Sequence, residues 1–213
     1  ATIEDWLAVF EDVTKRDLRQ FSRWYTQAGT PRLSVEETFD AGTYTLRFRQ
    51  RTPPTPGQAE KLPQVIPIAV GLLAPDGSEV VPTTVLEMTQ EEQSFSFDGL
   101  AARPVPSLLR GFSAPVILDR ASDATERAFL LAHDTDAFNR WEAGRSLAKE
   151  VLLRMVGDNA PPSADYLAAL DQVLADDTLD PAFRALVLQL PSEDDIAQSL
   201  HDNGTTPDPT AIH

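Results

Sequence analysis

Hydrophobic residues in the first thirty positions recur at helical spacing and predict two helices. Thr2 and Asp5 have the spacing of a capping box at the start of the first helix, and Thr14 and Asp17 repeat it at the start of the second. Gly29 is a suitable residue to end the second helix. The two apolar faces consist of Ile3, Trp6, Leu7, Phe10 and Val13, and of Leu18, Phe21, Trp24, Tyr25 and Ala28. Two short helices cannot bury so many aromatic rings against each other, so we expect them to pack on a larger body.

From Arg32 the apolar residues alternate with polar ones, which is typical of half-buried strands. A turn at residues 40–42 joins the first two predicted strands, and Pro53, Pro54 and Pro56 make residues 50–64 an extended loop. The predicted strands are Leu33–Phe39, Tyr44–Phe48, Val65–Leu73, one or two between Glu79 and Thr89 interrupted by Pro82, Gln93–Phe97, and Phe112–Leu118. Six or seven short strands with non-helical connections predict an Ig-like antiparallel β-sandwich over residues 31–119.

After Asp119 the helical spacing returns. The predicted helices are Thr125–His133, one beginning near Asp136, one capped by Ser163 with Leu167, Leu170 and Val173, one opened by Asp180-Pro181 with Phe183, Leu186, Val187 and Leu190, and one capped by Ser192 with Asp195. Consecutive antiparallel helices of this length are typical of the start of an α-solenoid. The predicted fold class is therefore α+β, with two helices (residues 1–30), a central β-sandwich (31–119) and the first solenoid helices (120–213).

Charge and composition narrow the possible partners. The formal net charge is 18 − 33 = −15, and residues 120–213 contribute −10 of it (7 basic and 17 acidic residues). Such an acidic surface disfavours nucleic acid and anionic membranes as partners; we interpret it as a solubility feature rather than an acidic docking face. No apolar run approaches the ~20 residues of a membrane span. The sequence contains no cysteine and no visible leader, from which we expect a cytoplasmic location.

The sequence offers no catalytic or metal-binding residues that we can assign. The three histidines, His133, His201 and His213, lie far apart, and no His-Glu-x-x-His occurs, so we predict neither a zinc site nor another bound cofactor in these residues. His133 ends a predicted helix, where capping of carbonyl groups is its expected role. Nucleophile-elbow, P-loop and dinucleotide motifs are also missing from the sequence.

Other polar and aromatic groups have structural interpretations that we favour. The acidic pairs and triplet stand at predicted turns or helix starts; they are Glu91-Glu92, Asp176-Asp177 and Glu193-Asp194-Asp195. Arg47, Arg49 and Arg51 alternate on one strand, as expected for a solvated face or a row of ion pairs rather than a ligand clamp. An aromatic set could line a ligand pocket, but a buried interface is the favoured interpretation; it consists of Trp6, Phe10, Phe21, Trp24 and Tyr25.

Both ends of the sequence suggest a piece of a longer polypeptide. A helix begins immediately after Ala1, which is not an initiator Met. Asp208-Pro209 has the form of a helix N-terminus, yet the sequence stops four residues later at His213. We therefore expect that further segments of the same chain lie outside these 213 residues.

Five segments together resemble bacterial aminopeptidase N, a zinc metallopeptidase of the gluzincin group. They are TIEDWLAVFEDVTKRDLRQFSRWYTQAGTP (2–31), QRTPPTPGQAEKLPQVIPIAVGLL (50–73), PVPSLLRGFSAPVIL (104–118), FNRWEAG (138–144) and DPTAIH (208–213). The resemblance implies that residues 1–30 end the catalytic domain, that 31–119 form the small sandwich, and that 120–213 begin the C-terminal superhelix. The family's zinc-binding motif, its Gly-Ala-Met-Glu-Asn motif and its catalytic tyrosine match no position here, so the resemblance supplies no site residue.

Two functional hypotheses follow. In the first, the chain is a catalytically inactive fragment of a zinc aminopeptidase that releases N-terminal amino acids from peptides; it acts as a spacer and helps to enclose the active site. Its partners would then be the parent's own catalytic domain and the rest of the superhelix, with zinc only in the parent. In the second, it is a free-standing module that binds a partner protein. A standalone hydrolase has little support, given only three histidines.

Overall fold

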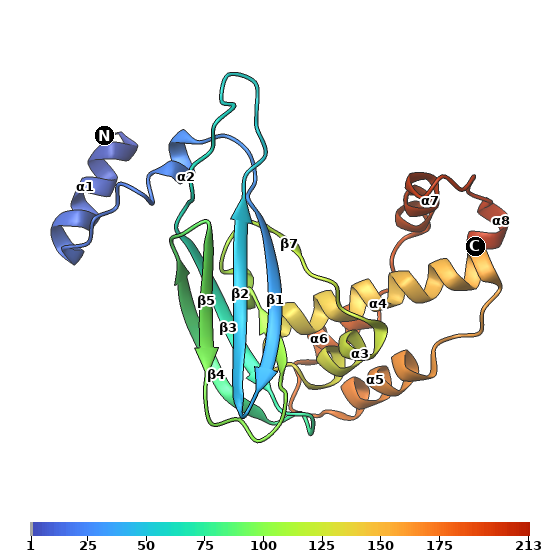
Figure 1. The fold of residues 1–213 in the computed structure, drawn as a ribbon. Coiled ribbons are helices and arrows are strands. Elements are labelled where there is room, and N and C mark those ends of the chain that lie inside the picture. The colour runs from blue at the N-terminus through green and yellow to red at the C-terminus, as the bar shows by residue number, and fades with distance from the viewer. Residues whose placement is uncertain (1) are drawn as a thin grey trace. The chain divides into compact units, whose positions relative to one another are not determined.

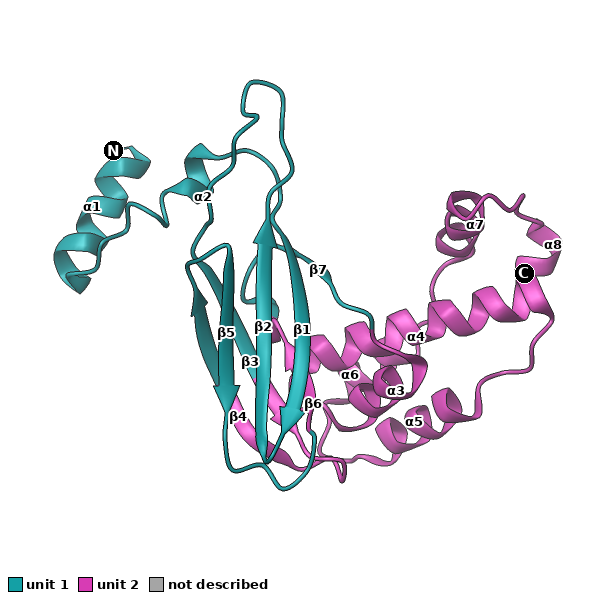
Figure 2. Ribbon diagram, viewed as in Figure 1, with its two compact units in different colours: residues 1–70, 84–103, 112–121 teal, residues 71–83, 104–111, 122–213 magenta. Residues whose placement is uncertain are grey.

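The computed structural model describes residues 2–213 and divides into two compact units (Figures 1 and 2). Unit 1 comprises residues 1–70, 84–103 and 112–121, and unit 2 comprises residues 71–83, 104–111 and 122–213. The units therefore interleave along the sequence, because residues 71–83 and 104–111 are grouped with the helices of residues 122–213. The predicted boundaries at residues 30 and 119 remain a prediction.

The first predicted helix is confirmed and the second is largely wrong. Helix α1 (Ile3–Thr14) begins with the predicted capping box between Thr2 and Asp5. Of the second helix only one turn forms, α2 (Arg23–Thr26). The carboxylate of Asp17 accepts hydrogen bonds from the backbone and side chain of Arg19, so it does not cap a helix with Thr14. Local side-chain bonds of this kind compete directly with helix formation.

A four-stranded sheet in the order β5-β2-β1-β7 belongs to unit 1. Strands β1 (Arg32–Asp40) and β2 (Thr43–Arg51) form the predicted antiparallel hairpin, and β5 (Glu92–Phe97) pairs with β2. The predicted strand at Phe112–Leu118 is reduced to β7 (Ile117–Asp119), which pairs with β1 in parallel. Residues 110–112 form a 3₁₀ turn instead.

The second sheet has three strands in the order β4-β3-β6. Strand β3 (Ile66–Leu73) is the predicted central strand. Strand β4 (Glu79–Met88) runs without interruption through Pro82, contrary to our prediction, because an edge strand can accommodate a residue without an N–H. Strand β6 (Val105–Leu108) was not predicted, since its four residues are too few to show an alternating pattern.

The core of unit 1 lies between these sheets. Alternate residues of β2 are buried, as predicted from the period of two, whereas β3 is buried at every position except Pro67, as expected for a central strand. The largest buried side chains of this core are Leu33, Tyr44, Leu46, Phe48, Ile66, Ile68 and Met88.

The proline-containing loop between β2 and β3 is ordered by side-chain hydrogen bonds. The Lys61 ammonium donates to the Ala28 carbonyl oxygen (2.8 Å), Thr55 Oγ1 (2.7 Å) and Gln58 Oε1 (2.9 Å). Gln50 binds the backbone of Gln64 in both directions, since its Oε1 accepts from the N–H and its Nε2 donates to the carbonyl oxygen. These bonds satisfy the backbone groups of Gln64 and the carbonyl of Ala28, which lie outside the sheet ladders.

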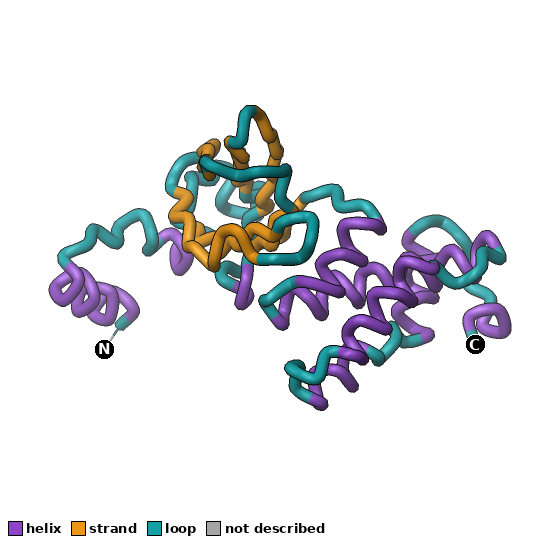
Figure 3. The backbone as a smooth tube through the Cα atoms, turned by 90° about the horizontal axis from the view of Figure 1, so that it is seen from below, coloured by secondary structure: helices purple, strands orange, loops and turns teal. Residues whose placement is uncertain are grey.

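Unit 2 contains six helices among the described residues, which Figure 3 shows in purple. They are α3 (Ala124–His133), α4 (Ala137–Asp158), α5 (Ala164–Ala175), α6 (Pro181–Val187), α7 (Glu193–Asp202) and α8 (Pro209–Ile212). The predicted caps at Ser163, Asp180, Ser192 and Asp208 are all present, and Asp136, near which we expected a helix to begin, caps α4.

The helical core of unit 2 corrects part of the predicted apolar faces. Leu131, Leu147, Tyr166 and Val173 pack in one cluster. Leu167, Leu186 and Leu190, which we assigned to buried helix faces, are exposed. In α5 the buried residues are Tyr166, Ala169 and Val173, so Val173 agrees with the predicted face, whereas Tyr166 takes the buried place that we gave to Leu167.

Candidate functional site

The three histidines do not form a site. His133 is the last residue of α3 and its ring lies 4.9 Å from that of Phe129. His201 lies on the exposed surface of α7, and exposed His213 contacts Glu193 (2.8 Å), whose hydrogen bond raises the pKa of the imidazole. Within residues 2–213, no cluster of three or more histidine, aspartate or glutamate side chains has a geometry suited to a metal ion.

The acidic groups singled out in the sequence mainly close turns and cap helices. Asp176 accepts from the hydroxyl and the N–H of Thr178, and chiefly the hydroxyl bond lowers the pKa of its carboxyl. Asp195 completes the capping box with Ser192, whose hydrogen bonds lower the pKa of Asp195. Carboxylates that hydrogen bonds hold in the ionised form are poorly suited to general acid catalysis near neutral pH.

Two of the three arginines on β2, Arg47 and Arg49, form ion pairs, which agrees with the predicted solvated face or row of ion pairs. Arg47 and Arg49 both contact Glu92 on β5, and Arg47 also lies 3.5 Å from Glu36 on β1. All three arginine side chains are exposed on the face of the four-stranded sheet. Exposed pairs of this kind contribute little stability.

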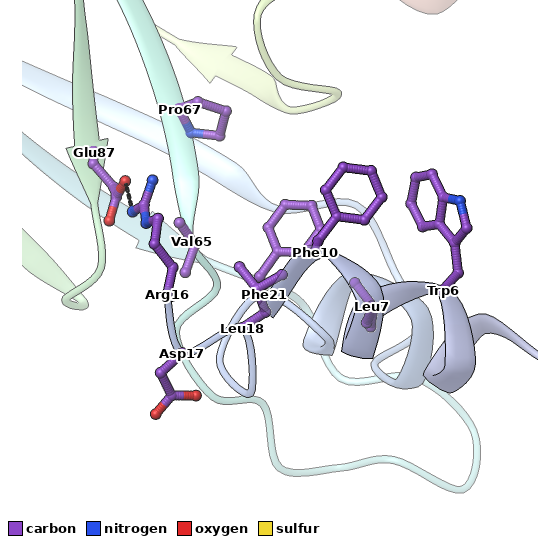
Figure 4. A pocket seen from close by; sticks show the side chains of 10 residues that line it. All are labelled: Trp6, Leu7, Phe10, Arg16, Asp17, Leu18, Phe21, Val65, Pro67 and Glu87. Carbon is purple, nitrogen blue, oxygen red and sulfur yellow. Dashed lines mark hydrogen bonds and ion pairs between the residues drawn. The ribbon is translucent and has the colours of Figure 1, made fainter. Parts of the chain in front are cut away.

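The aromatic residues of α1 and the following segment line a concave apolar surface, which Figure 4 shows from close by. Its cavity volume is about 350 Å³, and its rim carries the ion pair between Arg16 and Glu87. The residues that line it are Trp6, Leu7, Phe10, Arg16, Asp17, Leu18, Phe21, Val65, Pro67 and Glu87. We call this surface the α1 groove.

Helix α1 leaves most of its apolar face uncovered. Leu7 is its only buried residue, whereas Trp6 is 57% and Val13 75% exposed. The rings of Trp6 and Phe10 contact each other edge to face with centroids 4.5 Å apart. Trp24 differs, because its indole Nε1 donates to the Val65 carbonyl oxygen (2.7 Å) and so anchors the segment.

Sequence reasoning missed two polar networks inside the units. In unit 1, Glu37 accepts hydrogen bonds from Tyr44 Oη (2.6 Å), Arg120 Nε (2.6 Å) and Arg103 (3.3 Å). In unit 2, the buried Arg110 contacts Glu79 and Asp134. Neither network has a signature in the sequence, because its members are separated by up to 83 positions.

The comparisons with known proteins cover both halves of the chain. A family model described as "Domain of unknown function (DUF3458) Ig-like fold" matches residues 29–121. Another, described as "Domain of unknown function (DUF3458_C) ARM repeats", matches residues 124–213. These matches confirm the predicted order of an Ig-like sandwich followed by solenoid helices. Among the described residues, the helices are all too short or too polar for a membrane span.

Individual relatives agree along the whole chain. Aminopeptidase N of Caulobacter vibrioides is 43% identical over 217 residues, which cover 100% of this chain and 25% of that protein. Aminopeptidase N of Escherichia coli is 38% identical, over 93% of this chain and 24% of that protein. A crystal structure of Legionella pneumophila aminopeptidase A in complex with aspartic acid superposes with a TM-score of 0.80 at 30% identity, covering 99% of this chain and 24% of that chain. The chain thus spans about a quarter of the length of the curated relatives it matches.

Proposed function

Because this chain belongs to the bacterial aminopeptidase N family, with homology along its whole length, we propose that it is a structural part of a zinc aminopeptidase. The parent would remove N-terminal amino acids from peptides by means of a zinc-activated water. In this proposal residues 31–119 are a spacer, residues 120–213 begin the superhelix that encloses the active site, and residues 1–30 belong to the catalytic domain.

The observation that carries the proposal is the uncovered apolar face of α1. A large aromatic side chain gains roughly 1.5–3 kcal/mol when it moves from water into an interface. Trp6 and Phe10 line the α1 groove and are both exposed. The parent's own catalytic domain is the proposed occupant of this face, because the chain covers only about a quarter of each relative.

The proposal places the catalytic zinc outside these residues. The three histidines belong to different elements, and the acidic residues of α5 and α7 serve as turn and cap residues. The net charge of −15 supports peptides rather than nucleic acid or anionic membranes as the parent's substrates and contacts. The lack of cysteine in the sequence is the basis on which we propose a cytoplasmic parent.

The first test measures metal content and hydrolysis of aminoacyl arylamides by the purified chain. We expect substoichiometric zinc and no turnover above the blank. Tightly bound zinc at one equivalent, or zinc-dependent turnover, would overturn the proposal.

The second test mixes the chain with the separately purified catalytic remainder of the parent, without the rest of the superhelix. We expect a complex that Trp6→Ser weakens at least about tenfold, since about 1.4 kcal/mol of burial is lost. Leu167→Ser, at an exposed apolar position on α5, is the matched control and should leave binding unchanged. Equal binding by both variants would contradict the proposal that the catalytic domain covers the apolar face of α1. If the chain binds an unrelated protein but not the remainder, it is the free-standing module instead.

A further inference from the structure

Arg110 is the most completely buried basic residue of unit 2, and its guanidinium holds parts of three elements together. Only 4% of the residue is exposed. Its Nη1 donates to Glu79 Oε1 (2.5 Å) and Thr83 Oγ1 (2.9 Å) on β4, and its Nε donates to Ser107 Oγ (2.8 Å) on β6. Its Nη2 donates to Asp134 Oδ1 (3.2 Å) at the corner between α3 and α4.

A second layer of hydrogen bonds connects the same strands to the same corner. Asn139 Nδ2 donates to Ser107 Oγ and to the Leu108 carbonyl oxygen, both at 2.8 Å. Thr135 Oγ1 donates to Glu79 Oε1 (2.8 Å), and the N–H of Gly111 donates to Asp136 Oδ2 (3.0 Å). Each strand is therefore linked to the corner through Arg110 and also independently of it.

The backbone around Arg110 is adapted to this position. Leu109 (φ 56°) and Gly111 (φ 60°) flank it in the left-handed region, which a leucine rarely adopts. On β3, a Cβ added to Gly71 would overlap the guanidinium of Arg110. The backbone of Gly71 does not have a positive φ, so the guanidinium, and not the backbone conformation, requires glycine here.

We propose that Arg110 and its partners form a buried polar latch that joins the ends of β3, β4 and β6 to the α3–α4 corner as one cooperative unit. The latch consists of Gly71, Glu79, Thr83, Ser107, Arg110, Asp134 and Asn139. All of these residues belong to unit 2, which includes residues 71–83 and 104–111 together with the helices. Removing the arginine leaves Asp134, whose side chain is fully buried, without its cation, a change that strongly disfavours the folded arrangement.

Backbone hydrogen exchange of the full chain tests the latch. In Arg110→Met we expect exchange to rise at least tenfold in residues 71–83, 104–111 and 131–140 together, and to stay unchanged in residues 32–51 of unit 1. Arg145→Met is the matched control, because Arg145 pairs with Asp195 at the surface (2.9 Å) and should affect only its neighbourhood. A rise confined to residues 107–113 in Arg110→Met would overturn the proposal.

A double-mutant cycle tests the link between Arg110 and Gly71 without relying on one variant. Gly71→Ala should lower the melting temperature by several degrees in the wild type, and should have at most about a one-degree effect when combined with Arg110→Met. Additive effects would show that Gly71 is required for another reason and would overturn the latch. If Arg110→Met does not fold, Thr83→Val replaces it, and the same three segments must respond together.

Discussion

At the scale of single residues, Glu37 shows how a partly buried carboxylate is kept ionised. Burial by itself would raise the pKa of Glu37, but hydrogen bonds from Arg120 and Tyr44 outweigh it and hold the pKa below the usual value of 4.5. Burial, and after it the hydrogen bond to Glu37, raises the pKa of the Tyr44 hydroxyl. The ionised form of Glu37 is therefore favoured by folding.

Replacing Glu37 by glutamine should change the pH dependence of stability. The folded pKa is lowered, so its contribution is present above pH 4.5 and is lost as the pH falls through the lower folded value. We expect Glu37→Gln to lower the free energy of unfolding at pH 7 by about 1–3 kcal/mol. The loss should shrink as the pH falls below 4.5. Urea unfolding at pH 7 and pH 3 measures both values, and an equal loss at the two would contradict this account.

Residues of this kind mark where sequence-based prediction fails. The sequence analysis assigned no role to Gly71 or to Arg110. Arg110 depends on Asp134 and Glu79, which lie 24 and 31 positions away, and Gly71 depends on Arg110 itself, so no local pattern connects these residues. The histidine and carboxylate assignments, by contrast, depended on spacing and on helix caps, which are visible within four residues.

At the scale of elements, caps proved the most predictive local feature. The capping box of α1 and the caps of four helices after Asp119 were predictable because both bonded groups lie within three residues. The helix predicted from Thr14 failed, although its apolar spacing was equally regular. There Asp17 binds Arg19, and Glu11 Oε1 accepts from the N–H of Leu18 (2.8 Å), so local polar bonds outweighed the apolar pattern.

The cap of α1 should matter more than its packing for local order. Because only Leu7 of α1 is buried, few tertiary contacts support the helix. We expect Thr2→Ala to cost about 1 kcal/mol of helix stability and to speed amide exchange in residues 5–14. The urea midpoint of the sandwich should not change. Val13→Ala, at an exposed position without a cap bond, is the control; similar exchange in the two variants would argue against a role for the cap.

At the scale of the whole molecule, each unit has a core of its own. Leu46 and Phe48 are fully buried in unit 1, and Leu131 and Leu147 are buried in unit 2. The change from period two to helical spacing made the order of these parts predictable from the sequence. The interleaving of the units was not predictable, because the strand ends are held by the side-chain contacts of Arg110.

Cavity-forming substitutions should therefore act on one unit at a time. We expect Leu147→Ala to destabilise unit 2 by about 2–5 kcal/mol and to raise exchange in residues 71–83 as well as in the helices. Phe48→Ala should destabilise unit 1 by a similar amount and raise exchange in residues 32–51. Exchange that rises equally in both units for either variant would show that the chain unfolds as one body.

The hydrogen bonds of Lys61 have a consequence for chemical labelling. The sequence has only three lysines, and the side chain of Lys15 is 77% exposed, whereas all three N–H groups of Lys61 are occupied by acceptors. An acylating reagent should thus modify Lys15 before Lys61. Reaction at Lys61 requires the loop between β2 and β3 to open, so acylation of this single amine reports how often the proline-containing loop leaves its ordered conformation.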